Sequence, residues 1–395
     1  MISRRTTSGT STARNSIGNK RPMRYFFLLI LLLPVVAQVY VSWRMWQLMP
    51  LPVWARLLVV ILMAAAFGLF FYAMMPRLDR LPLPLASAVY QVGTSWLIIV
   101  CYLLMLWVVL DVLRVCHIVP AYLLRNSWTG TALVVGLMAV VFTYGYFHYI
   151  NKVRVRVDLS TDKSLAAMPT DEQGQVRPLR IVMTSDWHLG YHNRKRALAH
   201  WIDLINAEQP DVILIAGDII DHSFRPLEEE QMAAEFHRLT APVYACLGNH
   251  EYISGASGAL QFYDEAGIRL LRDEVVEEGP LMIVGRDDRV NHHRASLQDL
   301  TERLPADKYT IVLDHQPYRL EEAEQAGVDF MLAGHTHHGQ VWPLSWITDA
   351  LYECAYGRYQ RGHTHYYISS GLGIWGGKFR IGTRSEYIVA ELKEN

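Results

Sequence analysis

The sequence predicts a chain in two parts: a transmembrane domain of four helices, followed by an α/β domain of layered sheets and helices. Nearly all of the long apolar runs lie before Asn151. From Lys152 onward, short β-branched runs alternate with helix-like stretches, as in α/β layered domains. A length of 395 residues exceeds that of most single compact domains, which also favours two structural units.

The overall composition narrows the choice of partners. The formal net charge is −1, which gives no electrostatic case for binding nucleic acid. The four cysteines are widely spaced, so they form neither a disulfide framework nor a CxxC metal motif. We expect them to be isolated reduced or buried thiols.

Residues 1–24 are polar, lack apolar periodicity and are expected to form a disordered tail. Residues 25–150 then contain four apolar runs, each of the ~17–25 residues that a helix needs to cross a bilayer. A cleaved secretory signal is disfavoured for the first run, because Pro34 interrupts it and no small-x-small cleavage site follows. The four predicted spans are Tyr25–Trp43, Leu57–Met75, Ala86–Leu110 and Thr129–Tyr149.

The flanks of these spans predict the orientation. Lys and Arg are more frequent in the N-terminal tail, the second loop and the exit of the fourth span than in the other two loops. The positive-inside rule then predicts a multi-pass protein of the inner (cell) membrane, with the C-terminal domain in the cytoplasm. The spans contain almost no ionisable groups, so an anchor is favoured over a transporter.

The polar half begins with Val153–Asp158, whose period-two alternation predicts a strand. We assign residues 151–177 to a connecting strand and linker, and 178–395 to one α/β domain. Its expected helices are Arg194–Glu208 and Leu227–Leu239. Its expected strands are Arg180–Thr184, Val212–Ala216, Val243–Leu247, Leu281–Val284, Thr310–Leu313, Phe330–Ala333, Tyr366–Ser369 and Tyr387–Ala390.

Polar signatures directly follow five of these strands. Open α/β sheets place their active sites at the carboxyl ends of the strands, where several loops converge. The five turns are therefore expected to build one site. They are Ser185-Asp-Trp-His-Leu-Gly190, Gly217-Asp-Ile-Ile-Asp221, Gly248-Asn-His-Glu251, Asp314-His-Gln-Pro317 and Gly334-His-Thr-His-His-Gly-Gln340.

In order and type, these turns resemble the signature of calcineurin-like metallophosphoesterases: DxH, GDxxD, GNH[DE], HxP and GHxH. The resemblance covers about residues 178–392 and implies a four-layer αββα sandwich. Gly371-Leu-Gly373 and Gln340-Val-Trp-Pro343 are similar to the membrane-anchored bacterial branch of that family. Any one motif is weak evidence, whereas five in order are specific.

The resemblance implies two divalent metal ions, with Mn²⁺ favoured and Fe or Zn²⁺ as alternatives, since the ligands are oxygen and nitrogen and no thiolate is present. A hydroxide shared by the metals would attack phosphorus, and His250 would protonate the leaving group as the catalytic residue. The implied ligands are Asp186, His188 and His337 for the first metal, Asn249, His315 and His335 for the second, and Asp218 as the bridge.

Several nearby residues have more than one interpretation. Asp221 orients a ligand or caps a helix, and Glu251 stands where the family often has Asp. Arg286 holds a phosphate or forms an ion pair. His338 departs from a common Gly, while His292 and His293 are surface residues by default and substrate contacts as the alternative.

The tetrapeptide Gly-His-Thr-His occurs twice, at 334–337 and at 362–365. The first copy ends a buried-looking strand and lies twenty residues after His315, whereas the second precedes a strand in a loop rich in Tyr and Arg. The metal ligands are therefore assigned to the first copy.

The predicted function is a membrane-anchored binuclear phosphoesterase that cleaves a phosphodiester, pyrophosphate or phosphomonoester of a lipid-linked or nucleotide substrate. The aromatic segment 342–360 has three interpretations: a lid beside the metal centre, a bilayer-facing rim, or plain packing. An alternative from another class is a non-catalytic membrane sensor or scaffold that retains the metal site. The intact set of ligands argues against that alternative.

Overall fold

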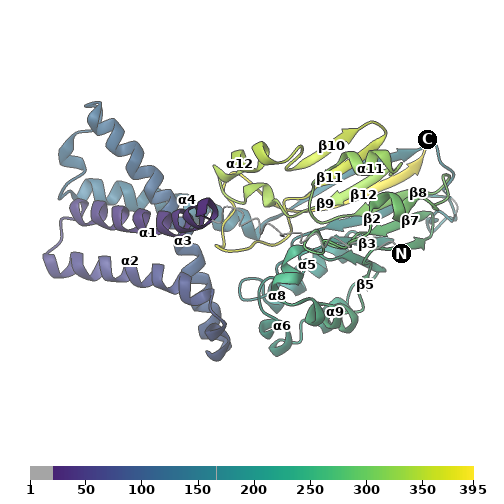
Figure 1. Cartoon of the computed structure of the whole chain (residues 1–395), viewed down its shortest axis with the longest axis horizontal. Coiled ribbons are helices and arrows are strands. Elements are labelled where there is room, and N and C mark those ends of the chain that lie inside the picture. Colours follow the sequence, from purple (N-terminus) through teal and green to yellow (C-terminus); the bar gives the residue numbers. More distant parts are fainter. Residues whose placement is uncertain (1–20, 166) are drawn as a thin grey trace, which may run out of the picture.

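The computed structural model describes residues 21–165 and 167–395, and the side chains from Leu32 onward apart from residue 166. It shows a helical domain on one side and a C-terminal domain of strands and shorter helices on the other (Figure 1). Of the predicted polar tail, residues 1–20 lie outside the described residues, and Arg21 begins the first helix.

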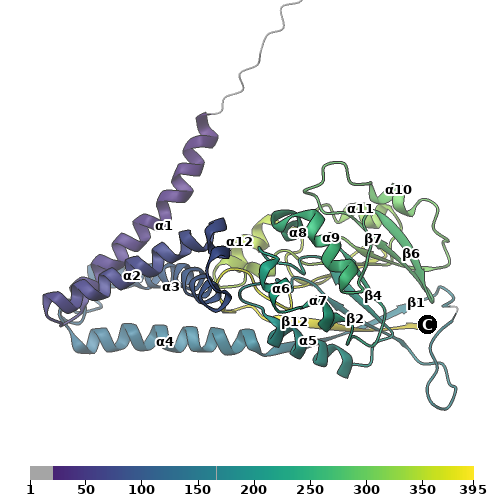
Figure 2. The same ribbon diagram turned by 90° about the horizontal axis from the view of Figure 1, so that it is seen from below.

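The helical domain contains four long helices joined by short connections (Figures 1 and 2). Three of them, α2, α3 and α4, are long and apolar enough to cross a membrane, among the residues searched. The first predicted span falls in α1, which continues to Leu48. Side chains of α1, α3 and α4 pack in one cluster that includes Val41, Trp107 and Val134. The helices are α1 (Arg21–Leu48), α2 (Val53–Ala73), α3 (Leu83–Val115) and α4 (Trp128–Ile150), with short 3₁₀ turns η1 (Pro76–Arg80) and η2 (Ala121–Leu123).

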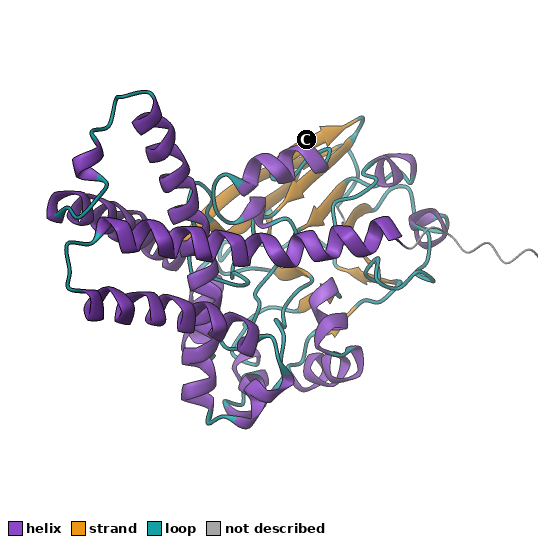
Figure 3. Ribbon diagram, turned by 60° about the vertical axis from the view of Figure 1, so that its left-hand side comes forward, coloured by secondary structure: helices purple, strands orange, loops and turns teal. Residues whose placement is uncertain are grey.

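The C-terminal domain contains two six-stranded mixed sheets. Their strands are drawn in orange in Figure 3 and lie together in one part of the molecule. In the first sheet, β2, β3, β4 and β5 run parallel to one another, while β12 is antiparallel to β2 and parallel to β1. Its order is β1 (Lys152–Thr161), β12 (Ser385–Glu394), β2 (Leu179–Thr184), β3 (Val212–Ala216), β4 (Val243–Cys246) and β5 (Arg269–Leu270).

In the second sheet, β11, β9, β8 and β7 are parallel, and the two edge strands pair antiparallel to their neighbours. Its order is β10 (Gly357–Arg361), β11 (Thr364–Ile368), β9 (Phe330–Ala333), β8 (Tyr309–Leu313), β7 (Leu281–Gly285) and β6 (Glu274–Glu278). The central strands are continuous β-branched and aliphatic runs because both of their faces are covered.

Three apolar clusters fill the layers of this domain. One lies between the sheets and contains Met183 and Leu214 from the first sheet with Ile311 and Leu313 from the second. A second packs α5 (Lys195–Ala207), α7 (Ala233–Phe236) and α9 (Ala256–Glu265) against the first sheet. A third packs α10 (Leu297–Thr301) and α11 (Glu321–Gln325) against the second sheet. This is the α/β arrangement of two packed sheets flanked by helices.

Several elements differ from the sequence prediction. The single helix expected over Leu227–Leu239 is two short helices, α6 (Arg225–Glu229) and α7. The strand predicted over Val153–Asp158 is present but longer, since β1 runs from Lys152 to Thr161 and pairs along its length with β12. Residues 342–360 contain the helix α12 (Leu344–Leu351), and α8 (Asn249–Ser254) begins at the candidate ligand Asn249.

Candidate metal centre

The five predicted turns meet at one end of the two sheets, and five candidate ligands in them have left-handed backbone conformations. Their φ angles lie between 46° and 70°. Non-glycine residues adopt this region rarely, at a cost of order 1–3 kcal/mol each, and such residues concentrate at functional sites. The folded domain therefore holds these side chains in place against a local preference for other conformations. They are Asp186, His188, Asp218, His335 and His337.

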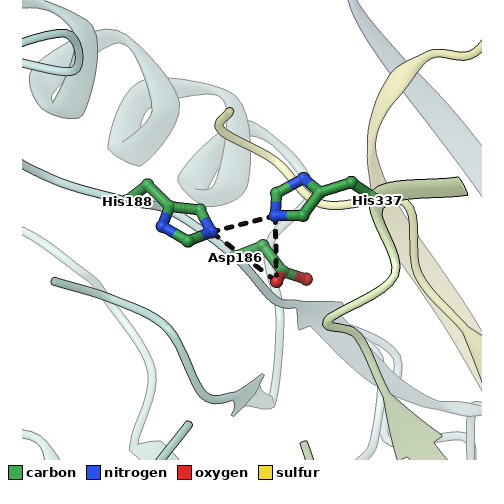
Figure 4. Close-up of side chains that lie close together, drawn as sticks. All are labelled: Asp186, His188 and His337. Atoms are coloured by element: carbon green, nitrogen blue, oxygen red, sulfur yellow. Dashed lines mark hydrogen bonds and ion pairs between the residues drawn. The ribbon is translucent and has the colours of Figure 1, made fainter. Parts of the chain in front are cut away.

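The first predicted ligand set is assembled as expected. Nε2 of His188 lies 2.9 Å from Nε2 of His337. Oδ1 of Asp186 is 3.3 Å from Nε2 of His337 and 3.8 Å from Nε2 of His188 (Figure 4). All three side chains are buried. Two imidazole nitrogens and a carboxylate oxygen that converge in this way form a donor set suited to a divalent cation.

The second predicted set lies beside the first. Oδ1 of Asn249 is 2.8 Å from Nδ1 of His335 and 3.2 Å from Nε2 of His315. Nδ1 of His315 donates to the carbonyl oxygen of Ala216 at 2.7 Å, which leaves Nε2 free of a proton in the neutral ring. This partner fixes the tautomer that a metal ligand needs.

Asp218 lies between the two sets. Its Oδ1 accepts a hydrogen bond from the backbone N–H of His250 at 2.9 Å. Its Oδ2 is 3.1 Å from Nε2 of His315 and 3.7 Å from Nε2 of His188. One carboxylate oxygen is thus anchored to the backbone, while the other faces a ligand atom of each set. A carboxylate placed in this way could be shared by two cations, one held by each set.

The electrostatics of the site favour added positive charge. Burial alone would lower the pKa of His188, but the neighbouring carboxylates of Asp186, Asp221 and Asp218 outweigh it and raise that pKa to about 10. Burial lowers the pKa of His335 to about 4 and of His337 to about 4, so these rings are neutral at pH 7. Metal binding requires neutral imidazoles and ionised carboxylates, so His335 and His337 already have the required state. Asp218 outweighs burial and raises the pKa of His315 as well, so His188 and His315 must each lose a proton when a metal binds.

Asp221 lies beside His188, a candidate ligand of the first set, and beside His250, the candidate general acid. Its Oδ1 is 3.4 Å from Nδ1 of His188 and 3.4 Å from Nδ1 of His250. Burial would raise the pKa of Asp221, but the hydrogen bonds from these imidazoles hold it well below its ordinary value. The carboxylate therefore orients both rings, which is the first of the two roles considered from the sequence.

Glu251 joins the turn that follows β3 to the turn that follows β4. Its buried carboxylate accepts from the backbone N–H groups of Asp218 (3.0 Å), Ile220 (3.0 Å) and Gly248 (2.7 Å). The role is structural. Gly248 is also required sterically, because an added Cβ would lie 2.1 Å from Oδ1 of Asp218.

Arg380 is a residue that the sequence interpretation missed. Its guanidinium is fully buried and donates to the carbonyl oxygens of His337 (2.8 Å) and Gly373 (2.9 Å). Burial lowers the pKa of Arg380 to about 10, so it stays protonated at neutral pH. Arg380 ties the turn after β9 to the glycine segment 371–373. It is an isolated arginine outside the motifs, so no local pattern indicates its role.

The remaining histidines and arginines lie apart from the two ligand sets. In the second Gly-His-Thr-His copy, His363 and His365 are exposed in the β10–β11 hairpin. His338 stacks on Tyr356 with ring centroids 4.7 Å apart. Arg286 is buried and pairs with Glu322 at 2.7 Å and Asp314 at 3.3 Å, so it forms the ion pair rather than presenting a free guanidinium. His292 and His293 are exposed.

The ligand sets open into a pocket of about 420 Å³. One wall is polar and carries the candidate ligands and His250. The other wall is apolar, formed by Leu344, Ile347 and Leu351 of α12 together with Trp375. A phosphoryl group at the ligands would therefore have an apolar surface beside it.

Comparison with known proteins agrees with this geometry. Residues 179–339 match the sequence profile of the family described as calcineurin-like phosphoesterase. This part of the chain is therefore a calcineurin-like metallophosphoesterase domain, a domain of phosphoester hydrolases. The match contains the first four turns in full and the fifth turn up to Gly339, including His335 and His337.

Several curated relatives share this domain. A metallophosphoesterase of Campylobacter jejuni is 30% identical over 55% of this chain and 60% of its own length. YkuE of Bacillus subtilis is 28% identical over 66% of this chain and 94% of its own length. A zebrafish protein named "Transmembrane protein with metallophosphoesterase domain" is 27% identical over 68% and 64%. The chain thus spans about 60% of the length of the first of these relatives. This similarity and the three long apolar helices together suggest a membrane protein.

Among solved structures, the 5′-nucleotidase precursor from Thermus thermophilus is similar with a TM-score of 0.35 and 18% identity. The similarity covers 54% of each chain.

The two copies of Gly-His-Thr-His provide a matched test of the ligand assignment. We expect His335→Ala to reduce the metal bound by purified, Mn²⁺-loaded protein from about two ions to about one per chain. His363→Ala changes the same residue type in the exposed copy and should leave the metal content unchanged. Elemental analysis after gel filtration measures both. Equal metal content in the two variants would contradict the assignment.

Proposed function

We propose that the protein is a membrane-bound phosphoesterase that depends on two divalent metal ions and hydrolyses a phosphodiester, pyrophosphate or phosphomonoester. The position of Asp218 Oδ2 between the two ligand sets is the observation that carries this proposal. One metal set alone would be compatible with a structural ion. Two sets that share a carboxylate are suited to holding a phosphoryl group between them.

The side chains have distinct tasks in such a reaction. When bound, two divalent cations neutralise phosphoryl oxygens and lower the pKa of a water molecule. His250 faces the same pocket, and its Nδ1 donates to the carbonyl oxygen of Asp221 at 2.7 Å. Nε2 is then the nitrogen that can carry a proton to the leaving oxygen. Asp221 and Asp218 lie near the ring, and they would stabilise its protonated form.

The apolar wall favours a lipid-linked substrate over a soluble nucleotide. Ile347, Leu351 and Trp375 are 54%, 69% and 52% exposed, although each lines the pocket. Figures 1 and 2 both place α12 at the end of the C-terminal domain nearest the long helices. A phosphoester whose acyl chains lie along α12 would bury this surface. Trp342 and Trp346, also exposed, would then form part of a bilayer-facing rim.

The full topology follows from the same proposal. With α1 counted as a span, four helices cross the membrane and both ends of the helical domain lie on one side. The distribution of Lys and Arg supports a cytoplasmic position for that side and for the C-terminal domain.

The activity is tested on detergent-purified full-length protein with a bis-aryl and a mono-aryl phosphate. We expect turnover that is lost on metal removal, restored by Mn²⁺, and abolished in Asp218→Asn. His250→Ala should retain its metal and lose about 10²–10⁴-fold in kcat, because only proton transfer is removed.

Metal binding without hydrolysis of either ester, or of a lipid phosphoester, would contradict the enzymatic proposal and favour the sensor or scaffold. An Asp218→Asn variant as active as the wild type would contradict the role of the bridging carboxylate.

The lipid preference has its own test. In Ile347→Ser/Leu351→Ser, we expect kcat/KM for a long-chain lipid phosphoester to fall about tenfold, with hydrolysis of the aryl phosphate unchanged. Val176→Ser replaces an apolar side chain that is 70% exposed and lies outside this pocket, and serves as the control. A uniform loss on both substrates would instead indicate damage to the metal centre.

A further inference from the structure

The candidate metal centre is in direct contact with a membrane helix. The hydroxyl of Tyr90, on α3, donates to Oδ2 of Asp221 at 2.9 Å. Both residues are buried, with 4% and 2% of their surface exposed. The other oxygen of Asp221 is the one that lies 3.4 Å from both His188 and His250. A single carboxylate therefore joins α3 to a candidate ligand and to the candidate general acid.

Two further contacts from the same stretch of α3 hold the turn that follows β2. Nε2 of Gln91 donates to the carbonyl oxygen of Tyr191 at 3.0 Å. Oγ1 of Thr94 is 3.0 Å from Nε2 of His192. Tyr191 and His192 directly follow the segment that carries Asp186 and His188, and residues 185–193 are all buried.

A second membrane helix reaches the backbone of the same turn. The hydroxyl of Tyr149, on α4, donates to Oδ1 of Asn193 at 2.5 Å. Nδ2 of Asn193 in turn donates to the carbonyl oxygens of Trp187 (3.0 Å) and His188 (2.9 Å). The turn with the first two metal ligands is thus fixed by side chains of α3 and α4.

The length of α3 explains how one helix can both cross a bilayer and contact the C-terminal domain. Its 33 residues span about 50 Å at 1.5 Å per residue, whereas a bilayer core is about 30 Å thick. The excess allows the part that contains Tyr90 and Thr94 to lie against the C-terminal domain. A tether alone would not require hydrogen bonds to buried groups, and α4 continues into β1 with only Asn151 between them.

We propose that the membrane helices are part of the metal centre, with Tyr90 as a positioning residue that orients Asp221 and, through it, His188 and His250. The inference rests on the metal-binding site proposed above and extends it to a residue 131 positions away from Asp221 in the chain. It implies that displacement of α3, by the bilayer or by a bound lipid, changes the affinity of the site for metal.

The test compares two tyrosines on α3 in full-length protein. Tyr90→Phe removes the hydroxyl that reaches Asp221. Tyr102→Phe removes a hydroxyl that donates to the backbone carbonyl oxygen of Trp342, at the same interface but away from the ligands. Binding of Mn²⁺ is followed by the electron paramagnetic resonance signal of the free ion. We expect Tyr90→Phe to weaken the affinity several-fold, with the roughly 10–100-fold loss typical of a ligand's direct partner as the upper bound, and Tyr102→Phe to leave it unchanged.

A double-mutant cycle separates positioning from general destabilisation. If Tyr90 acts through Asp221, Tyr90→Phe should have no further effect on Mn²⁺ affinity in an Asp221→Asn background. Additive losses in the cycle, or equal affinities of the Tyr90→Phe and Tyr102→Phe variants, would overturn this inference and leave the proposed function standing. Absence of Mn²⁺ binding by the wild type would instead overturn the metal centre itself.

Discussion

The structure of the C-terminal domain depends on burying three carboxylates, Asp186, Asp218 and Asp221, within one small volume. Like charges at such distances repel strongly where water is excluded, and each buried charge needs a partner. The protein supplies imidazoles and backbone N–H groups from five different turns. In the absence of metal, part of this balance comes from protonated histidines such as His188, whose pKa is raised. Divalent cations would take over that role.

The two packed sheets make this arrangement possible. Parallel strands bring the turns after β2, β3 and β4 to one edge, and β8 and β9 add theirs from the second sheet. Several of these turns keep ligands in left-handed backbone conformations, which the surrounding packing must stabilise. Glu251 and Arg380 show how this is done, because each uses a buried charged group to hold the backbone of two separate turns. The unfavourable backbone conformations are at the site, and the hydrogen bonds of buried side chains around it offset their cost.

The sequence predicted the parts of this site that have local patterns. A polar residue directly after a buried strand is visible in sequence, and so all seven predicted ligands and His250 came from such turns. Most central strands were also placed to within one or two residues, because a fully covered strand is a continuous apolar run, but β12 extends to Glu394, four residues past its predicted end at Ala390. The edge strand β6, Glu274–Glu278, was missed because its exposed acidic residues are not typical of a strand. Tyr90, Asn193 and Arg380 could not be found, since their roles arise only from contacts between distant segments.

The helical domain was interpreted from the sequence as an anchor, on the basis of its uncharged spans. The structure adds that α3 and α4 form hydrogen bonds to residues 191–193, directly after the turn bearing Asp186 and His188, and that α3 also reaches Asp221. The apolar wall of α12 lies at the same end of the domain. The candidate metal centre, the apolar wall and the long helices are thus adjacent, which is the arrangement that the proposed hydrolysis of a membrane-bound phosphoester requires.

The central claim is that two metal ions share Asp218. Electron paramagnetic resonance of the wild-type protein saturated with Mn²⁺ tests it most directly, because a carboxylate-bridged pair is magnetically coupled. If Asp218 bridges two ions, the spectrum should show the hyperfine pattern of an exchange-coupled Mn²⁺ pair. A spectrum of isolated, uncoupled Mn²⁺ at full occupancy would contradict it.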